Sequence, residues 1–382
     1  MLVCVRVRVL KQPKYYLNVL HVNHLIIAIV FSLKDCMHQS TQSTQSNLSQ
    51  FGTVLVTGGS GLVGSALRDV HGAELKYQFV FASSRDCDMT DYEATLTYFR
   101  AVAPDAVIHL AAAVGGLFKN MRCKVDMFET NVRINMNVLR VCHELRVSKV
   151  VSCLSTCIFP DDRTNATAFK EINEGMLHAG PPHASNDAYA YAKRMLEVQT
   201  RCYRQQYGHN FVCVIPTNIY GPYDNFNLED AHVIPALIHK CYLAKQQGVP
   251  LVVAGSGAPL RQFIYSRDLA HLLIWVLECY DANHDAKHDA DGAGAGTLIL
   301  SVDPADEISI AQVVSHIVDA VGFDNDVVYD TTQADGQFKK TADNSKFKRL
   351  YGNNSPFAFT SIRQGLRETV QWFIQNYNDA RK

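Results

Sequence analysis

The sequence lacks the features that define several common classes of protein. Its 382 residues include eleven cysteines but no CxxC pair, which argues against a disulfide framework and against a zinc site of familiar spacing. Lysine and arginine number 36 against 37 aspartate and glutamate residues, so no overall basic field is present to hold a nucleic acid or a membrane surface. We therefore expect a cytoplasmic protein with local phosphate binding, no metal, no nucleic acid and no membrane partner.

The first fifty residues lack both a membrane span and a globular pattern. Their longest uninterrupted apolar run is Leu25–Phe31, which is short beside the roughly 20 residues that cross a bilayer, although the basic residues before it resemble a weak signal sequence. Residues Gln39–Gln50 form a polar, low-complexity stretch that cannot bury a core. We expect residues 1–50 to be an N-terminal extension, disordered or not native, with targeting as the alternative, and folded structure to begin near Thr53.

From Thr53 onward, short runs rich in β-branched residues alternate with longer stretches of helical periodicity. This alternation predicts βαβ units around a doubly wound parallel sheet, an α/β fold of the Rossmann type over residues 51–216. Strands are expected at Thr53–Thr57, Phe79–Ala82, Ala106–Leu110, Lys149–Leu154 and Phe211–Pro216, and helices at Phe128–Leu145 and Tyr189–Tyr207.

Beyond the fifth strand the pattern becomes irregular. Residues 217–382 are expected to form mainly a smaller substrate-binding lobe, with residues 260–280 returning to the Rossmann domain. Helices are expected at Val233–Gln247 and Asp268–Tyr280. Residues 281–296 have no apolar periodicity, and their histidines are isolated among small and acidic residues, so we expect a solvated surface insertion and not a metal site.

A glycine-rich loop directly follows the first expected strand and leads into a helix, which is the context of a dinucleotide-binding loop. Gly58 and Gly61 permit a tight turn and close approach of the backbone, and Gly64 allows helix and strand to pack. The pyrophosphate of the cofactor is expected at the helix N-terminus. The predicted cofactor-binding residues of the loop are Gly58, Gly59, Ser60, Gly61, Leu62, Val63 and Gly64.

The second expected strand lacks the acidic residue that would bind the ribose hydroxyls of NAD about 20 positions after the glycines. The strand ends instead in Ser83, Ser84 and Arg85. A guanidinium with adjacent hydroxyls suits a 2′-phosphate. The sequence therefore favours NADP(H) over NAD(H), although Asp86 follows immediately.

A serine, a tyrosine and a lysine carry the pattern of a reductase. Tyr189 and Lys193 are four residues apart and share one helix face, and Ser155 stands at the end of the fourth expected strand. A neighbouring ammonium favours the phenolate, so Tyr189 is expected to exchange a proton near neutral pH while Ser155 hydrogen-bonds the same substrate oxygen.

Together with the segment His109–Ala112, these motifs resemble those of the extended short-chain dehydrogenase/reductases. A narrower resemblance, to the GDP-L-fucose synthase family, runs from about Thr53 to the C-terminus, leaving out residues 281–296. The matching segments are Val150–Pro160, Pro216–Pro222, Asp224–Asn227, His232–Pro235, Arg261–Tyr265 and Asp335–Lys340.

This resemblance implies 3,5-epimerisation of GDP-4-dehydro-6-deoxy-D-mannose, reduction at C4 with NADPH to GDP-L-fucose, and a homodimer. It also implies that Cys157 and His232 are the acid–base pair of the epimerisation. Implied cofactor contacts are Asp88, Leu110, Ala111, Ala112, Lys193, Pro216, Asn218, Ile219 and His232, and implied substrate contacts are Asn218, Lys240, Arg261 and Asp335. Members of the family commonly carry tryptophan where this chain has Ala254, a difference that bears on substrate packing more than on reaction type.

Two other functions stay open at this point. Another nucleotide-sugar epimerase or 4,6-dehydratase of the extended group would recycle its cofactor, and a dehydratase usually places an acidic pair where this chain has Thr156 and Cys157. A noncatalytic NADP(H)-sensing protein would be expected to lose Tyr189 or Lys193, and both are present.

Overall fold

Six parallel strands form the central sheet of this computed structural model, in the order β10-β5-β4-β3-β1-β2. The structure describes residues 52–71, 77–161, 171–282, 285, 294–333, 339–352 and 356–382. The strands are β1 (Thr53–Thr57), β2 (Gln78–Ala82), β3 (Ala106–His109), β4 (Lys149–Cys153), β5 (Asn210–Pro216) and β10 (Thr297–Leu300). The first five match the predicted strands to within one residue at each end, so the predicted α/β fold is confirmed.

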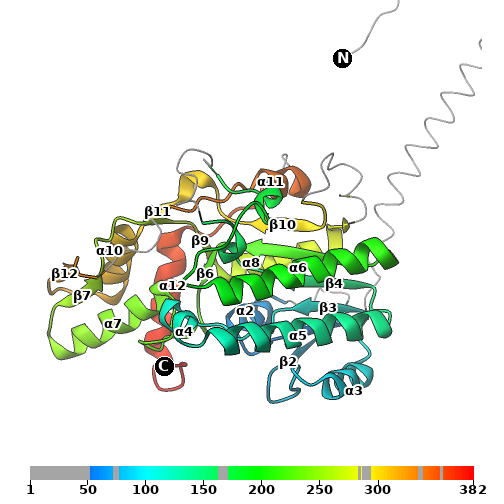
Figure 1. Cartoon of the computed structure of the whole chain (residues 1–382). Coiled ribbons are helices and arrows are strands. Elements are labelled where there is room, and N and C mark those ends of the chain that lie inside the picture. The colour runs from blue at the N-terminus through cyan, green and yellow to red at the C-terminus, as the bar shows by residue number, and fades with distance from the viewer. Residues whose placement is uncertain are drawn as a thin grey trace, which may run out of the picture. The chain divides into compact units, whose positions relative to one another are not determined.

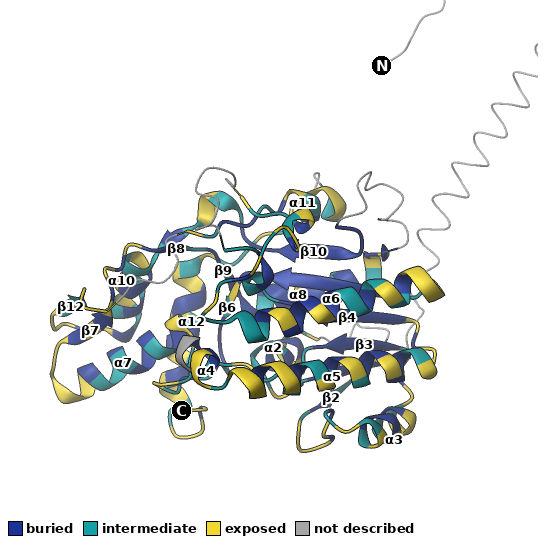
Figure 2. Ribbon diagram, viewed as in Figure 1, coloured by how far each residue is buried: buried dark blue, intermediate teal, exposed yellow. Residues whose placement is uncertain are grey.

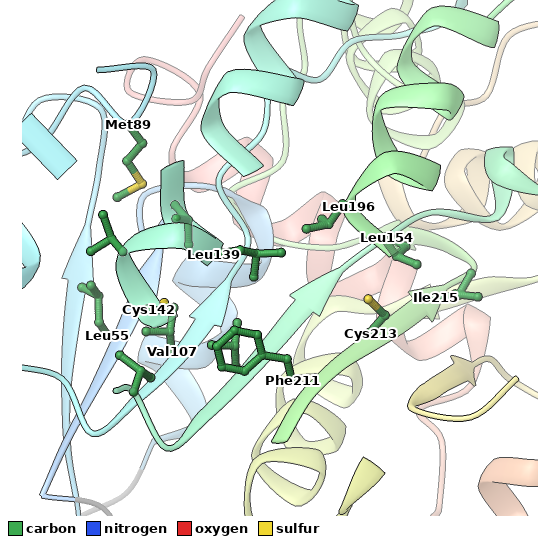
Figure 3. Close-up of a cluster of buried hydrophobic side chains, with 14 of the residues drawn as sticks. Leu55, Met89, Val107, Leu139, Cys142, Leu154, Leu196, Phe211, Cys213 and Ile215 are labelled. Atoms are coloured by element: carbon green, nitrogen blue, oxygen red, sulfur yellow. The ribbon is translucent and has the colours of Figure 1, made fainter. Parts of the chain in front are cut away.

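Helices cover both faces of the sheet, which is why its strands are apolar throughout. One face carries α3 (Tyr92–Val102), α5 (Lys124–Glu144) and α6 (Asp187–Tyr207), and the other carries α2 (Leu62–Val70) and α8 (Ser266–Cys279) (Figure 1). Leu55 of β1 packs in the same buried cluster as Leu139 and Leu196 (Figure 3). Its neighbours Val54 and Val56 belong to the cluster on the opposite face, because successive side chains of a strand alternate.

A second hydrophobic core lies beyond the sheet, among helices and strands drawn from the C-terminal half of the chain. They are α7 (Val233–Gln247), β7 (Leu251–Ala254), α10 (Ile310–Val321), β12 (Val327–Asp330) and α12 (Ile362–Gln375). Their buried residues include Ile238, Val253, Ile317 and Phe373. The remaining elements are α4 (Leu117–Arg122), η1 (Thr156–Ile158), η3 (Glu174–Met176), β6 (Asn218–Tyr220), β8 (Leu260–Arg261), β9 (Phe263–Tyr265), η4 (Pro304–Asp306), β11 (Ile308–Ser309) and α11 (Ser345–Tyr351).

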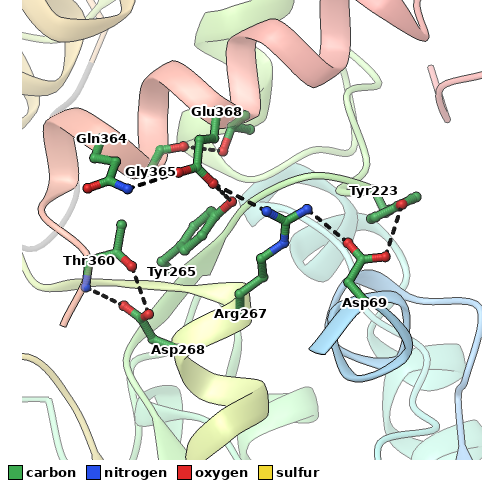
Figure 4. Close-up of polar contacts among 10 residues, drawn as sticks. Asp69, Tyr223, Tyr265, Arg267, Asp268, Thr360, Gln364, Gly365 and Glu368 are labelled. Atoms are coloured by element: carbon green, nitrogen blue, oxygen red, sulfur yellow. Dashed lines mark hydrogen bonds and ion pairs between the residues drawn. The ribbon is translucent and has the colours of Figure 1, made fainter. Parts of the chain in front are cut away.

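A polar network joins the first helix of the sheet domain to the last helix of the chain. Arg267 of α8 donates to Asp69 of α2 at 3.1 Å and to Glu368 of α12 at 3.3 Å (Figure 4). The hydroxyl of Tyr265 donates to Glu368 at 2.7 Å, and that of Tyr223 donates to Asp69 at 3.2 Å. The helix that follows the glycine loop is therefore tied to the second core through α8.

The ends of the segment 281–296 differ from the solvated loop that the sequence predicts. Asp285 is buried, accepts hydrogen bonds from the Tyr280 hydroxyl at 2.6 Å and from the Gly296 amide at 3.1 Å, and forms an ion pair with Lys346 at 2.7 Å. These charge-assisted contacts compensate the buried carboxylate. They also bring the chain back to the sheet as β10, a strand that was not predicted from the sequence.

Among the described residues, no helix is long and apolar enough to cross a membrane. The predicted N-terminal extension, residues 1–50, lies outside the described residues.

The last residues of the chain pair with the loop that precedes α7. Asn225 forms a β-bridge with Arg381, and the Phe226 amide donates to the Arg381 carbonyl at 2.7 Å. The Arg381 guanidinium donates to the carbonyl of Tyr223 at 2.6 Å. Between these contacts Asp224 is buried, one of its carboxyl oxygens has no hydrogen-bond partner among the described residues, and burial raises its pKa to about 7.

We expect Asp224→Asn to remove part of the pH dependence of stability. The unfolded carboxyl has a pKa of about 3.9, so the folded state binds the extra proton between about pH 4 and pH 7, and stability falls as pH rises through that window. At pH 8 the variant should be more stable than the wild type by about 1–3 kcal/mol, a range set below the full free energy that corresponds to the pKa difference. Urea unfolding at pH 5 and pH 8 measures this, and equal losses of stability over that interval in both proteins would contradict it.

Candidate active site

The glycine loop lies at the point of the sheet where β1 has β2 on one side and β3 on the other. Gly58 has a φ of 70°, and a Cβ there would lie 2.8 Å from the amide nitrogen of Ala111. A Cβ at Gly64 would lie 2.6 Å from the Cα of Gly59. Gly64 therefore lies tight against the backbone of the turn that follows β1, where a side chain has no room.

The N-terminus of α2 is open to an anion. Its N-cap residue is Gly61, and no described side chain caps the helix. The amides of a first helical turn have no partner within the helix and carry a partial positive charge. Together with the crowded glycine turn, this arrangement fits the pyrophosphate of a dinucleotide.

The turn after β2 uses most of its polar side chains internally. The backbone amide and the hydroxyl of Ser83 both donate to Asp86 at 2.7 Å, and these bonds lower the pKa of that carboxyl. The Asp88 carboxylate accepts hydrogen bonds from the amide and hydroxyl of Thr90 at 2.9 and 2.7 Å. The Ser83 hydroxyl is thus engaged with Asp86, and Arg85 is exposed beside the turn.

A buried hydrogen-bond relay fixes the segment Leu110–Ala112. The Thr57 hydroxyl accepts from the amides of Leu110 and Ala111 at 3.2 and 3.1 Å, and it contacts Nδ1 of His109 at 2.8 Å. Nε2 of His109 lies 3.1 Å from the amide oxygen of Asn135 on α5. Burial, with a smaller effect from Lys193, lowers the pKa of His109 to about 3, so the imidazole is neutral.

Neither this relay nor its neighbour Asn131 was predicted from the sequence. The Asn131 side chain accepts from the amide of Ala113 at 3.0 Å and donates to its carbonyl at 2.9 Å. A signal was available in the sequence. Asn131 and Asn135 are four residues apart and occupy buried positions on the same side of α5 as Met127 and Val138. Polar residues at apolar positions of an amphipathic helix need buried partners.

Ser155, Cys157, Tyr189 and Lys193 come from two adjoining elements. Ser155 follows β4 and its hydroxyl accepts from the Cys157 amide at 3.4 Å at the start of η1. Tyr189 lies in the first turn of α6, with its ring centroid 5.8 Å from Nζ of Lys193. The Lys193 ammonium is buried and donates to the carbonyl of Cys153 at 2.8 Å. The predicted serine, tyrosine and lysine therefore gather at the carboxyl end of β4.

The protonation state of Tyr189 differs from the expected phenolate. Burial raises its pKa well above the usual value, and the thiols of Cys157 and Cys153 raise it further. Lys193 directs its ammonium to a backbone carbonyl and does not offset this burial. Tyr189 is thus a neutral phenol, which suits it to give a proton to a substrate oxygen.

Cys157 and His232 are both neutral in this arrangement. Burial raises the pKa of the Cys157 thiol, and a hydrogen bond with Ser155 partly opposes that effect. His232 is the N-cap residue of α7, and desolvation lowers the pKa of its imidazole. Among the described residues, no hydrogen bond joins His232 to Cys157 or Tyr189.

The loop before His232 is fixed to the sheet domain. The Asp230 carbonyl accepts from the Gly116 amide at 2.8 Å, and the Asp230 carboxylate lies 3.8 Å from Lys119 and 3.5 Å from Arg122 of α4. A Cβ at Gly116 would lie 2.5 Å from the Ala231 carbonyl oxygen. These contacts hold the histidine segment against the domain that carries Cys157.

The other predicted contacts are spread over the C-terminal half of the chain. Pro216 ends β5, while Asn218 and Ile219 lie in β6, where the side-chain Nδ2 of Asn218 donates to the Gln262 carbonyl at 2.9 Å. Lys240 lies on α7, two turns beyond His232. Arg261 lies in β8, and burial lowers its pKa. Ala254 is exposed at the end of β7, and Asp335 lies outside the described residues.

The part of the chain that the structure describes contains no group of three or more histidine, cysteine, aspartate or glutamate side chains able to hold a metal ion. The residues of the site support hydride transfer with a dinucleotide held at the glycine loop, and proton transfer by Tyr189, Cys157 and His232.

Comparison with known proteins agrees with this geometry. Residues 54–288 match the NAD dependent epimerase/dehydratase family. A GDP-L-fucose synthase of Dictyostelium discoideum is 51% identical over 332 residues, 86% of this chain and 98% of that protein. A probable GDP-L-fucose synthase of Drosophila melanogaster is 45% identical over 338 residues, 86% of this chain and 99% of that protein. The crystal structure of a GDP-L-fucose synthetase from Naegleria fowleri bound to NADP is 44% identical, has a TM-score of 0.78, and covers 88% of this chain and 98% of that one.

Proposed function

Because the chain belongs to the NAD dependent epimerase/dehydratase family, and within it to the GDP-L-fucose synthases, we propose that it converts GDP-4-dehydro-6-deoxy-D-mannose to GDP-L-fucose. The enzyme epimerises C3 and C5 of the sugar and reduces C4 with NADPH. The observation that carries this proposal is the gathering of Ser155, Cys157, Tyr189 and Lys193 at the carboxyl end of β4, in a chain 51% identical to a GDP-L-fucose synthase. Release of GDP-L-fucose from the keto-sugar and NADPH, identified by chromatography against a standard, tests it.

One carbonyl serves all three chemical steps. The C4 ketone acidifies the protons on C3 and C5, so hydrogen-bond donors that stabilise charge on its oxygen help each enolate form and also help C4 accept a hydride. Ser155 and Tyr189 are these donors. Since burial keeps Tyr189 protonated, its hydroxyl gives the proton that the C4 oxygen needs when C4 is reduced.

Epimerisation needs one group to remove a proton and another to return a proton to the opposite face. Cys157 follows β4, and His232 begins α7 of the second core. They can therefore approach the sugar from different elements, one as base and the other as acid. Both groups start neutral, so each inversion leaves the net charge of the site unchanged.

The glycine loop, the open N-terminus of α2 and Arg85 hold the cofactor, and bound NADPH supplies the hydride for C4. The relay through Thr57, His109 and Asn135 fixes the wall formed by Leu110–Ala112 beside the loop. Lys193, buried between Tyr189 and the Cys153 carbonyl, holds α6, the helix that carries Tyr189, in a fixed position beside β4. Asn218, Lys240, Arg261 and Asp335 are proposed to contact the GDP-sugar.

We expect Arg85→Ala to raise the KM for NADPH by about 10- to 100-fold, the loss expected for a charge-assisted hydrogen bond worth about 1.5–3 kcal/mol. The KM for NADH should change little, because NADH has no 2′-phosphate. Arg100→Ala, which removes an exposed arginine from α3, is the matched control. Equal changes in both KM values, or no change in either, would show that Arg85 does not select the cofactor.

The outer faces of α5 and α6 are proposed as the interface of a homodimer. Exposed apolar side chains gather there: Val125, Phe128, Met136, Tyr191 and Met195. Phe128, Tyr191 and Met195 line a shallow hollow of about 430 Å³ between the two helices. Figure 2 shows exposed positions along both helices on the side away from the sheet. Large exposed apolar patches on soluble proteins mark interaction sites.

Met195→Glu should therefore convert the dimer to a monomer, with an increase of at least about 100-fold in the dissociation constant, because burying an unpaired charge in an interface costs several kcal/mol. Sedimentation velocity over a range of concentrations measures this. Ile374→Glu places the same charge at another exposed apolar position, on α12, and should leave the dimer intact. A Met195→Glu protein that sediments as the wild type would exclude this face.

We also propose that the enzyme works in the cytoplasm. All nine cysteines among the described residues are free thiols, and a reducing compartment keeps thiols in that state.

A further inference from the structure

Arg194, the residue after Lys193 on α6, is buried at the back of the turn that carries Cys157. Its Nε donates to the carbonyl of Ile158 at 2.6 Å, and one terminal nitrogen donates to the carbonyl of Gly180 at 2.7 Å. A guanidinium presents several donors in a rigid plane, so it can hold two backbone segments in one fixed relation.

The two segments that Arg194 joins also contact each other. Pro160 forms an antiparallel β-bridge with Pro182, and the amide of Asp161 donates to the carbonyl of Pro181 at 2.9 Å. Arg194 thus closes a small unit made of η1, the residues that follow it, and the segment that leads into α6. Cys157 lies between the bond from its amide to Ser155 and the bond from Arg194 to Ile158.

We propose that Arg194 is a positioning residue for epimerisation: it fixes η1 from behind, so that the thiol of Cys157 is held at the distance and angle that proton transfer to carbon requires. The inference rests on the proposed function, because it assumes that Cys157 exchanges protons with the sugar. Displacing a catalytic group by about 1 Å can lower the rate roughly 10²-fold. Losing the two hydrogen bonds by which Arg194 fixes η1 is therefore expected to slow proton transfer strongly.

Arg194 fixes the position of η1, and its positive charge also favours the thiolate form of Cys157. The charged and titratable groups that face Cys157 are Tyr189, Lys193 and Arg194 on α6 and Lys340 on the segment before α11. The three cations favour the thiolate, whereas burial opposes it and raises the pKa of the thiol. Removing one cation should therefore move thiolate formation to higher pH.

The same helix supplies a matched control. Arg204 is also buried on α6 and also donates to two backbone carbonyls, those of Phe211 at 3.3 Å and Ala295 at 2.6 Å. Its contacts lie toward β5 and β10, away from η1. Replacing Arg204 removes a comparable number of buried hydrogen bonds without touching the turn of Cys157.

The test compares Arg194→Gln and Arg194→Lys with Arg204→Gln in the full-length enzyme. Deuterium entry at C3 and C5 of the keto-sugar in heavy water measures epimerisation, and the KM for NADPH measures cofactor binding. We expect Arg194→Gln to slow deuterium entry at least about 10-fold, Arg204→Gln to slow it less than about twofold, and neither to change the KM for NADPH. Arg194→Lys, which keeps the charge but replaces the planar guanidinium by a single donor nitrogen, should recover part of the rate.

The rate of iodoacetamide alkylation of the Cys157 peptide, followed by mass spectrometry from pH 6 to 10, provides an independent measurement. Its midpoint should shift to higher pH in Arg194→Gln and less in Arg194→Lys. Equal deuterium entry and equal alkylation profiles in Arg194→Gln and Arg204→Gln would overturn the role of Arg194. Failure of the wild-type enzyme to incorporate deuterium would instead overturn the proposed function. The alkylation comparison would then still test whether Arg194 affects the thiol of Cys157.

Discussion

Replacing Tyr189 with phenylalanine is expected to lower the rate of C4 reduction by about 10²–10⁴-fold, the range that positioned acid–base groups contribute. The phenol is the neutral proton donor of the site because burial raises its pKa, and phenylalanine keeps the ring while removing the proton. Deuterium entry at C3 and C5 should persist at a reduced rate, since Ser155 still donates to the ketone oxygen. The loss of NADPH absorbance measures reduction.

Tyr207→Phe is the control for this variant, because it makes the same change at an exposed position at the end of α6. It should reduce the substrate at the wild-type rate. A Tyr189→Phe enzyme that oxidised NADPH as fast as the wild type would remove Tyr189 from the mechanism.

Replacing Cys157 with serine is expected to produce the opposite division of activities. Deuterium entry at C3 and C5 should fall by about 10²–10⁴-fold, because a serine hydroxyl is a far weaker acid than a thiol and exchanges protons poorly with carbon. Hydride transfer to the C4 carbon needs Tyr189 and Ser155 and not the thiol, so slow reduction of the unepimerised keto-sugar should continue. The product should therefore keep the configuration of the substrate at C3 and C5.

Cys202→Ser alters an exposed cysteine of α6 and should leave both activities unchanged. Undiminished formation of epimerised product by Cys157→Ser would be incompatible with its assignment to the acid–base pair.

The sheet domain could be predicted closely because its local signals agree with one another. β1 combines β-branched residues with a following glycine turn, and each of the next four strands contains a short apolar run rich in β-branched or aromatic residues. β10 was missed because the four residues Thr297–Leu300 follow a stretch without periodicity, and an apolar run of that length does not distinguish a sheet strand from any other buried segment. The buried contacts of Asp285 that lead into β10 are long-range and leave no local pattern.

At the site, the types of the reacting residues could be predicted but their environment could not. The spacing of Tyr189 and Lys193 placed them on one helix face, yet the ammonium bonds a carbonyl and burial keeps the phenol protonated. Arg194 looks in the sequence like any charged residue of an amphipathic helix. Its importance depends on two carbonyls brought to it by segments that precede α6 in the chain.

The use of one C4 ketone for two inversions and one reduction can be measured in a single experiment, by incubating the purified enzyme with GDP-4-dehydro-6-deoxy-D-mannose and NADPH in heavy water. We expect one NADPH to be oxidised for each sugar consumed, with deuterium at both C3 and C5 of the product. Deuterium incorporation without NADPH loss would contradict it and identify an epimerase alone. NADPH loss without deuterium at either carbon would contradict it equally and identify a simple reductase.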